Sequence, residues 1–253
     1  MNYNWHWQVL LEAEPGGTGS YLHYLIVGLG WTLVTALAAW VLALSIGAIV
    51  GTLRTTPLKW AVRLGNLYVE IFRNVPLIVQ MFLWFFVVPE LLPPAIGDWI
   101  KQMPPPWSSY LPAVMCLGIF TSVRVAEQLR AGINSLPRGQ RMAGIATGLT
   151  EAQAYRYVIL PQAFRIILPP LTSESMNIIK NSSVAFTIGL LELTGRAMAM
   201  QEFSFRVFEA FTAATVIYLI TNLLVVLMMR ALEKKVRVPG LIAASGGTLQ
   251  AGH

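Results

Sequence analysis

The sequence contains uncharged stretches that are too long for an ordinary soluble protein. No Asp, Glu, Lys or Arg occurs between Glu14 and Arg54, and a second such stretch separates Lys101 from Arg124. A helix needs about 20 apolar residues to cross the hydrocarbon core of a bilayer. Hydrophobic residues make up 55% of the 253-residue chain and charged residues only 12%. The chain is therefore expected to be an integral membrane protein.

The hydropathy pattern predicts an all-α, polytopic membrane protein with five transmembrane helices in one domain, residues 1–253. The first and last spans carry no charged residue, whereas the fourth is interrupted by two prolines, Glu174 and Lys180. A helix with such residues cannot face lipid on all sides. The first apolar run is too long for a signal-peptide core, so we expect it to stay as an anchor. The predicted spans are residues 24–53, 67–91, 111–133, 166–190 and 210–229.

Lysine and arginine are distributed unevenly between alternate loops. Cytoplasmic loops of membrane proteins carry the excess of these residues. We therefore expect a periplasmic N-terminus and a cytoplasmic C-terminus. The residues assigned to the cytoplasmic side are Arg54, Lys59, Arg63, Arg130, Arg138, Arg141, Arg156, Arg165, Arg230, Lys234, Lys235 and Arg237, and those assigned to the opposite side are Lys101, Arg196 and Arg206.

Patterns that would support catalysis or the binding of a metal or nucleotide are missing from the sequence. His6, His23 and His253 lie at or near the termini and lack metal-binding spacing. The single cysteine, Cys116, cannot form an intrachain disulfide. No G-x-x-x-x-G-K-[ST] pattern occurs, so the chain has no P-loop. We expect neither an enzyme nor a bound cofactor or metal, and the basic residues beside the spans indicate contact with membrane lipid rather than nucleic acid.

The segment between the third and fourth spans, residues 134–165, has an unusual pattern for a membrane connector. Small residues recur in it, a turn follows at Gly148, and an amphipathic stretch then ends at Leu160 and Pro161. Small residues let another backbone approach closely. We interpret the segment as a helix-turn-helix docking surface. The alternative is an ordinary connector whose basic residues only set the topology.

The stretch that begins at Gly139 resembles the cytoplasmic loop of permease subunits of binding-protein-dependent ABC importers. That loop follows the pattern E-A-A, three residues, G, nine residues, I-x-L-P, and this chain reads M-A-G at 142–144, G at 148 and V-I-L-P at 158–161. Met142 replaces the glutamate. The resemblance implies the type I ABC importer permease fold, with the loop as a coupling helix in a cleft of a separate ATPase subunit. The implied docking residues are Ala143, Gly144, Gly148, Leu149, Leu160 and Pro161.

Further stretches resemble a narrower subgroup, the polar amino-acid permeases. They are LYVEIFRNVPLIVQ, VAEQLRAGINSLPRGQ, YVILPQAFRIILPPLTSE and NIIKNSSVAFTIG. PLIVQMFLWFFVVPELLP and TSVRVAEQLR are most similar to the glutamate/aspartate permease subunits. The resemblance implies a bacterial inner-membrane importer that moves an acidic amino acid by alternating access. It also implies three partners: an ATPase dimer that binds ATP and magnesium, a second and related permease subunit, and a periplasmic solute-binding protein.

Arg124 is a charge placed deep in the third span. Helical spacing puts it on one stripe with Thr121 and Gln128. A charge near the middle of the bilayer costs about 3 kcal/mol, so Arg124 needs a partner. In one reading its side chain reaches the cytoplasmic surface or pairs with Glu127. In the other, the stripe faces a water-filled cavity, where the guanidinium holds the carboxylate of the acidic substrate that the resemblance implies. The predicted substrate-binding residues are Arg124, Thr121, Gln128, Asn181 and Ser182.

Other polar and small residues in the spans carry further expectations. Asn181 and Ser182 lie where the fourth span is expected to cross the middle of the bilayer, which suits contact with the backbone of an amino-acid substrate. Gly118, Ser122 and Ala126 recur every four residues, and this spacing predicts a close helix–helix contact.

Charged residues in the second and fourth spans have structural readings as well. Glu70 and Arg73 are three residues apart, which favours an ion pair between them. Lys180 either pairs with Glu174 or lines the transport path.

Two other classes of protein stay open from the residues alone. They are a secondary transporter, in which a charged residue within the spans couples protons to the substrate, and a membrane-embedded scaffold.

Overall fold

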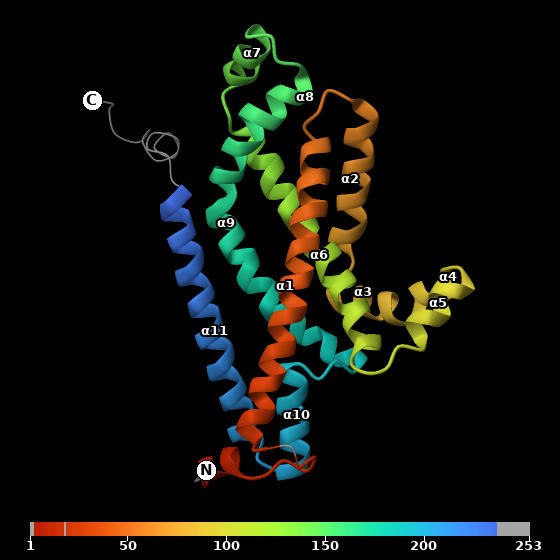
Figure 1. The fold of residues 1–253 in the computed structure, drawn as a ribbon, viewed down its shortest axis with the longest axis vertical. Coiled ribbons are helices and arrows are strands. Elements are labelled where there is room, and N and C mark those ends of the chain that lie inside the picture. The colour runs from red at the N-terminus through yellow and green to blue at the C-terminus, as the bar shows by residue number, and fades with distance from the viewer. Residues whose placement is uncertain (1–2, 18, 237–253) are drawn as a thin grey trace.

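The computed structural model describes residues 3–17 and 19–236, which form helices joined by turns (Figure 1). Four long helices run along the molecule: α1 (Tyr21–Leu53), α6 (Trp107–Asn134), α9 (Leu160–Asn181) and α11 (Val207–Val236). The described part contains no β-strand element, in agreement with the predicted all-α class. We call the end at which the N-terminus lies the N-terminal end and the opposite end the loop end. Arg237 and His253, named above, lie outside the described residues.

Shorter elements cover the two ends and one side of the bundle. Helices α7 and α8 form a hairpin at the loop end, α10 lies at the N-terminal end, and α4 and α5 project sideways (Figure 1). The shorter elements are η1 (Trp7–Leu11), α2 (Lys59–Asn74), α3 (Leu77–Phe82), the π-helical η2 (Leu83–Val87), α4 (Val88–Leu91), α5 (Pro94–Lys101), α7 (Arg138–Ala146), α8 (Glu151–Ala154), the π-helical η3 (Tyr155–Ile159), the 3-10 helix η4 (Ser182–Ile188) and α10 (Leu193–Ser204).

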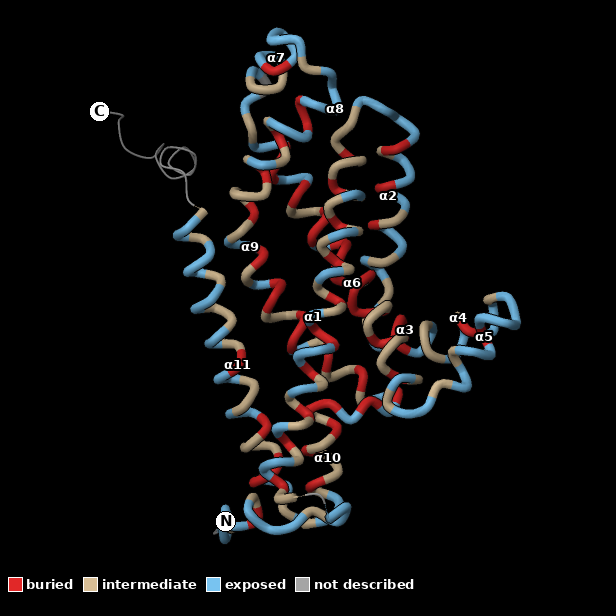
Figure 2. The backbone as a smooth tube through the Cα atoms, in the orientation of Figure 1, coloured by how far each residue is buried: buried red, intermediate tan, exposed pale blue. Residues whose placement is uncertain are grey.

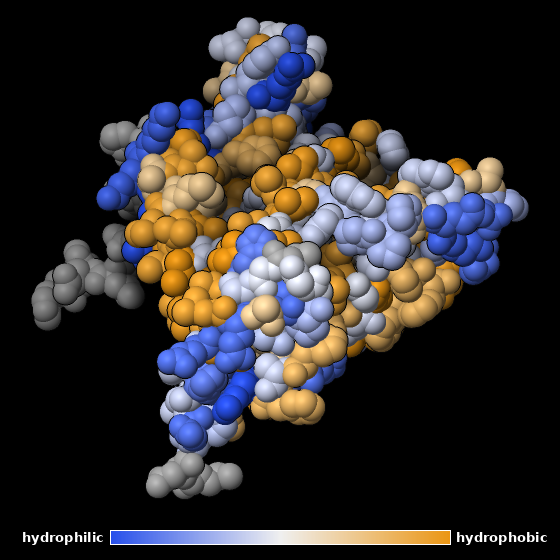
Figure 3. Space-filling view, turned by 60° about the horizontal axis from the view of Figure 1, so that its bottom comes forward, coloured by the Kyte–Doolittle hydropathy of each residue, from blue (hydrophilic) through white to orange (hydrophobic). Residues whose placement is uncertain are grey.

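Three of the predicted spans are confirmed as helices that are long and apolar enough to cross a membrane. These are α1, α6 and α11, which match or extend the predicted bounds. Apolar side chains cover the flanks of the molecule, whereas hydrophilic side chains gather at its tips (Figure 3). With the bent pair α2 and α3–α4 taken as one span, the described residues contain up to four candidate spans, against the five predicted.

The second predicted span, residues 67–91, is wrong as a single straight helix. Helix α2 and the helical segment Leu77–Leu91 meet at a bend of 102°. Pro76 explains the bend, because a residue before proline avoids the helical conformation, and Val75 is extended with φ −101° and ψ 128°. The Gln80 side chain donates to the Val75 carbonyl at 2.9 Å and to a carbonyl in the last turn of α2 at 2.8 Å. The break is thus closed by hydrogen bonds rather than left open in the membrane.

The fourth predicted span, residues 166–190, has different bounds in the structure. A helical run begins with α8, passes through η3 and continues as α9, and η4 then leads to Gly189, whose φ is +87°. Pro169 and Pro170 lie inside α9 without ending it. Helix α9 is not apolar enough to count among the candidate spans. This agrees with the expectation that it cannot face lipid on all sides.

Helix α6 is the central helix of the bundle. Of its most apolar stretch 72% is buried, against 11% for α11, and Figure 2 shows the same contrast. Helix α6 packs closely on α1, as the recurrence of Gly118, Ser122 and Ala126 predicts. A Cβ atom on Gly47 of α1 would lie 2.9 Å from the Ser122 carbonyl oxygen, and one on Gly51 would lie 2.9 Å from that of Ala126. Small residues therefore bring the two backbones together.

At the N-terminal end, the buried acidic residue Glu192 joins three helices. Its carboxylate accepts hydrogen bonds from the Thr32 hydroxyl of α1 at 3.1 Å, the Tyr218 hydroxyl of α11 at 2.8 Å and the Gly195 amide of α10 at 2.9 Å. We call these four residues the α10 junction. Glu192 has no exposed surface, and short bonds from neutral donors satisfy its oxygens. The junction fixes α10 between α1 and α11.

Candidate functional site

Arg124 lies on α6 with a side chain that is 46% exposed. Its guanidinium carbon lies 5.4 Å from the centre of the Phe120 ring, one turn earlier on the same helix. One guanidinium nitrogen, Nη1, lies 3.6 Å from Oε2 of Glu174 on α9. The partner of Arg124 is thus on a neighbouring helix, and of the alternatives left open above the pairing with Glu127 is wrong. The reason is the close approach of α9 to α6, which spacing along one helix cannot reveal.

Glu174 is buried but loosely held. Besides the Arg124 contact, its carboxylate accepts hydrogen bonds from Nε2 of Gln128 at 3.4 Å and from Nδ2 of Asn177 at 3.5 Å. These separations are long for hydrogen bonds. The Oε1 atom of Gln128 is buried without a partner among the described residues. We call Arg124, Gln128, Glu174 and Asn177 the Arg124 cluster, and it has unused hydrogen-bonding capacity.

The Arg124 cluster has the chemistry of a carboxylate-binding site. A guanidinium presents five N–H donors in a planar fork that matches a carboxylate in two places. Within the part of the chain that the structure describes, Arg124 donates no hydrogen bond closer than its 3.6 Å contact with Glu174. Its half-exposed face is thus able to receive an anion, while Glu174 and Phe120 hold the other side.

A second ion pair links α2 to α6. Nη1 of Arg73 lies 3.0 Å from Oε1 of Glu127. Arg73 therefore pairs across helices, and the predicted pair with Glu70 is wrong. Lys180 is exposed, and the predicted pairing of Lys180 with Glu174 is also wrong, because Arg124 occupies that position.

The other predicted substrate-binding residues lie in different surroundings. Thr121 is buried on α6, and Asn181 is half-buried at the end of α9. Ser182 is fully buried, and its hydroxyl donates to the Ile179 carbonyl at 2.8 Å. Of the predicted set, the structure brings Arg124 and Gln128 together at one carboxylate, whereas the Ser182 hydroxyl faces its own helix. Their contact with substrate stays a prediction.

The glycines of the predicted docking segment shape the hairpin of α7 and α8. Gly148 ends α7 with φ +92°, and the amides of Gly148 and Leu149 donate to the carbonyls of Ile145 and Gly144 at 2.9 and 3.2 Å. This is the Schellman arrangement, which favours glycine. Gly144 is buried, and a Cβ atom there would lie 3.6 Å from that of Ala154. The sequence therefore folds here into a tight turn of two packed helices.

The exposed side of the same hairpin is small and apolar. Ala143 and Pro161 are exposed, and Leu160 is half-buried. Met142, at the position of the glutamate in the pattern, is 65% exposed. A hollow of about 380 Å³ lies beside them. Its lining residues are Gln140, Ala143, Gly144, Thr147, Leu149, Val158 and Gln162. This surface suits a protein partner more than water.

Two acidic residues acquire roles that the sequence analysis did not assign. The sequence predicted that Arg124 needs a partner, because charges in spans are paired, but it did not predict that the partner is Glu174. Glu192 precedes L-T-G, and its side chain accepts from the Gly195 amide as a helix N-cap. An acidic residue at that position of a helix is the signal that could have identified it.

These features define a class of protein. A helical bundle with apolar flanks, an arginine–carboxylate pair between two of its helices and an exposed apolar hairpin at one end indicates a membrane protein that meets a partner outside the bilayer. The chain belongs to the family of binding-protein-dependent transport system inner membrane components, which matches residues 43–238. It is accordingly a multi-pass inner-membrane permease subunit of an amino-acid ABC importer and not an enzyme, because the ATPase is a separate subunit. The family favours this class over a proton-coupled secondary transporter.

Relatives span nearly the whole chain. The glutamate/aspartate import permease protein GltJ of Escherichia coli K12 is 47% identical over 241 residues, which cover 95% of this chain and 98% of GltJ. The probable amino-acid ABC transporter permease protein PatM of Vibrio harveyi is 36% identical over 78% of this chain and 84% of PatM. The glutamine transport system permease protein GlnP of Escherichia coli K12 is 33% identical over 82% of this chain and 89% of GlnP.

Solved structures share the fold. A structure described as an amino acid ABC transporter with histidines is 29% identical, with a TM-score of 0.71, and the match covers 85% of this chain and 95% of that one. The inward-facing MetNI methionine ABC transporter is 17% identical, with a TM-score of 0.65, over 86% of this chain and 96% of that one. The second likeness concerns the fold alone.

Proposed function

We propose that this permease subunit carries an acidic amino acid, glutamate or aspartate, from the periplasm to the cytoplasm in an ATP-driven importer. The observation that carries the proposal is the half-exposed Arg124 guanidinium, which is backed by Glu174 and Phe120 and holds unused donors. Such a group favours a substrate whose side chain ends in a carboxylate. The 47% identity to GltJ supports the same substrate class.

Within this proposal, Arg124 binds the side-chain carboxylate of the substrate. Gln128 lies beside it, and its Oε1 atom, buried without a partner among the described residues, is an acceptor for a donor such as the ammonium group of the substrate. Asn181 and Thr121 remain the candidates for the amino and carboxyl groups of the substrate backbone. Ser182 takes part only if its hydroxyl turns away from the Ile179 carbonyl.

The hairpin of α7 and α8 docks on the ATPase in this proposal. Its exposed small and apolar face, with Ala143, Met142 and Ile145, gives an ATPase cleft a surface to grip. The basic residues assigned to this side support a cytoplasmic loop end and a periplasmic N-terminal end. An ATPase dimer binds ATP and Mg²⁺, a second and related permease subunit completes the pathway, and a periplasmic solute-binding protein delivers the substrate. ATP binding then moves the hairpins and switches access between the two sides.

The experiment that tests the proposal is transport in proteoliposomes. The chain is reconstituted with its ATPase, its second permease subunit and its solute-binding protein, and uptake of labelled glutamate, aspartate, glutamine and arginine is measured with and without ATP inside the vesicles. We expect ATP-dependent uptake of the two acidic amino acids in preference to the others. Uptake driven by a pH gradient without ATP would instead indicate a secondary transporter. ATP-driven uptake that prefers glutamine or arginine would overturn the acidic assignment while leaving the importer class intact.

A further inference from the structure

The hairpin at the loop end is held together as one unit. Arg141 of α7 donates from Nε to Glu151 of α8 at 3.0 Å, and a second guanidinium nitrogen bonds the other carboxylate oxygen. Thr150 and Gln153 form a capping box at the start of α8. A paired fork and a capped start resist independent movement of the two helices. A force on α7 is therefore passed to α8 and to the residues that follow it.

Tyr155 connects this hairpin to the opposite side of the bundle. It begins the π-helical turn η3, directly after α8, and it is only 9% exposed. Its hydroxyl donates to the carbonyl of Thr55 at 2.6 Å. Thr55 lies in the turn between α1 and α2. Among the described residues, this is the one side-chain hydrogen bond that joins the segment from α7 to η3 to the turn between α1 and α2. Turns of π-helix are rare and often occur at functional sites.

Packing does not fill the space around this bond. A cavity of about 540 Å³ lies between the hairpin and the turn, lined in part by Thr55, Met142 and Tyr155. The Tyr155 ring belongs to the apolar cluster that includes Ile133 of α6 and Ile159. The ring is thus fixed on the α6–α9 side, while the hydroxyl reaches the α1–α2 side. Packing of α1 on α6 holds the two sides together further along the bundle, whereas at the turn itself, beside this hollow, the Tyr155 hydroxyl is the side-chain link between them.

We propose that Tyr155 is a positioning residue that makes the α1–α2 turn move together with the docked hairpin. This inference rests on the proposed ATP-driven function. The turn leads into α2, whose Arg73 pairs with Glu127 at 3.0 Å, and Glu127 lies one turn beyond Arg124 on α6. Motion of the hairpin thus reaches the Arg124 cluster by two routes. One runs directly along α9 to Glu174, and the other runs through Tyr155, the turn and α2.

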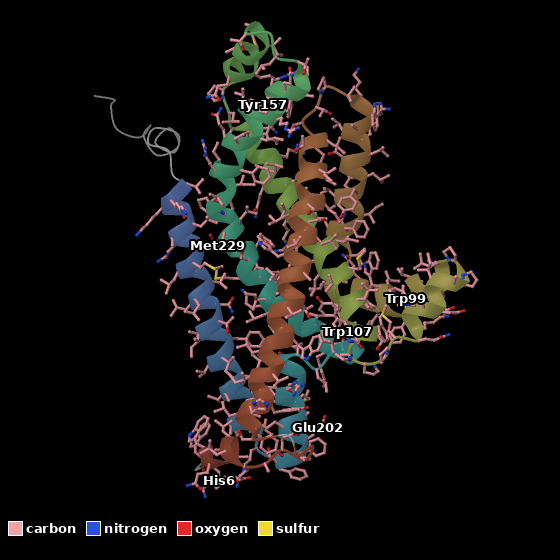
Figure 4. All side chains as sticks on the ribbon, viewed as in Figure 1. His6, Trp99, Trp107, Tyr157, Glu202 and Met229 are labelled. Atoms are coloured by element: carbon pink, nitrogen blue, oxygen red, sulfur yellow. The ribbon has the colours of Figure 1, made fainter. Side chains whose placement is uncertain are left out.

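The test is Tyr155→Phe in the complete reconstituted transporter, with Tyr157→Phe as the matched control. The first change removes one hydroxyl and leaves the buried ring in place. Tyr157 belongs to the same π-helical turn but is 62% exposed at the loop end (Figure 4). The quantity measured is the number of ATP molecules hydrolysed for each amino acid transported, which a purely structural defect in folding would not raise in the assembled fraction. We expect this ratio to rise about fivefold in Tyr155→Phe, the factor that corresponds to one lost hydrogen bond of about 1 kcal/mol, and to stay unchanged in Tyr157→Phe.

An equal ratio in the wild type and in Tyr155→Phe would overturn the inference while leaving the proposed function intact. Absence of ATP-driven uptake in the wild-type complex would overturn the proposed function itself. A second measurement does not depend on the assembly of Tyr155→Phe. Spin labels on Lys59→Cys and Tyr157→Cys, both exposed positions, report the separation of the turn and the hairpin. A separation that stays constant on ATP binding supports the inference, and a change of several ångströms contradicts it.

Discussion

The α10 junction and the Arg124 cluster each contain a buried carboxylate, and they hold it in opposite ways. Glu192 accepts bonds of 2.8 to 3.1 Å from three neutral donors on three helices. The contacts of Glu174 range from 3.4 to 3.6 Å, and its cationic partner, Arg124, is half exposed. One carboxylate is fully satisfied within the chain. The other leaves donors and acceptors unused beside an open surface.

Under the proposed function, this difference separates a structural carboxylate, Glu192, from one at the substrate site, Glu174. A buried polar network whose members are all satisfied fixes one arrangement of the helices around it. A loosely held network can exchange a partner for a ligand at little cost. The α10 junction is therefore a fixed frame at the N-terminal end, whereas the Arg124 cluster is where we propose that the substrate binds.

Removing each carboxylate in turn tests most directly whether Glu192 and Glu174 contribute differently to the stability of the bundle. Glu192→Ala removes the shared acceptor of three buried donors on three helices and leaves the Gly195 amide without this acceptor, while Tyr218 keeps its bond to Thr194 and Thr32 keeps its bond from the Leu193 amide. We expect it to lower the free energy of unfolding by about 3–5 kcal/mol. Glu174→Ala is expected to lower it by no more than about 1 kcal/mol, because Arg124 is already half exposed and the lost bonds are long. Chemical unfolding in detergent measures both values. Equal losses would remove the distinction between the two regions.

The contact between α1 and α6 offers a second test, because it shows whether loose packing is confined to the Arg124 cluster or extends to the rest of the bundle. In Gly47→Ala the added Cβ would lie 2.6 Å from Val125, and we expect a loss of about 1–3 kcal/mol in the free energy of unfolding. Gly30→Ala on the same helix meets nothing within 4 Å and serves as the control. It is expected to be neutral or slightly stabilising. If the two variants have the same free energy of unfolding, α1 and α6 are loosely packed, and loose packing is not confined to the Arg124 cluster.

The smallest effect is expected at the hairpin, where the acidic residue is exposed. Hydrogen bonds from Arg141 hold the pKa of Glu151 below its ordinary value. Since the pKa is lowered in the folded state, the contribution of the pair is complete above the ordinary glutamate pKa of about 4.3 and is lost as the pH falls through the folded-state value. We expect amide exchange in α7, corrected for its intrinsic pH dependence, to increase modestly over that acidic range. Glu151→Gln should show no such pH step, and an identical step in this variant would assign it to another group.

The sequence predicted those parts of the fold that lipid dictates. Helices α1 and α11 follow from long uncharged runs, because a lipid-exposed span must be apolar over its whole length. The bend at Pro76 went unpredicted, since the bulky apolar run after it has the composition of a continuous span. The bounds of α9 were predicted wrongly because this helix, unlike the second predicted span, is not continuously apolar. The charged residues Arg165, Glu174 and Lys180 lower its mean hydropathy, so hydropathy alone does not mark where the helix begins or ends.

The candidate site was predicted in part. Arg124 was identified because a charge deep in a span must be compensated. Its partner was not, because helical spacing relates residues on one helix, whereas Glu174 approaches from α9. The role of Glu192 was not predicted, because this residue lies just beyond the predicted fourth span and its donors come from helices far apart in sequence. The glycines of the predicted docking segment stand out in the sequence, but only the structure shows that Gly144 is buried and that Gly148 ends α7.

The central claim is that Arg124 reads the side-chain carboxylate of the substrate. The measurement that tests it most directly is the ratio of glutamate to glutamine uptake in the complete transporter, because these two substrates differ in charge and hardly in shape. In Arg124→Gln we expect this ratio to fall roughly 10- to 100-fold, as the loss of a charge-assisted bond of about 1.5–3 kcal/mol implies, with normal recovery of the complex. Arg130→Gln, at an exposed arginine on the same helix, should keep the wild-type ratio. An unchanged ratio in Arg124→Gln would show that the acidic substrate is selected elsewhere.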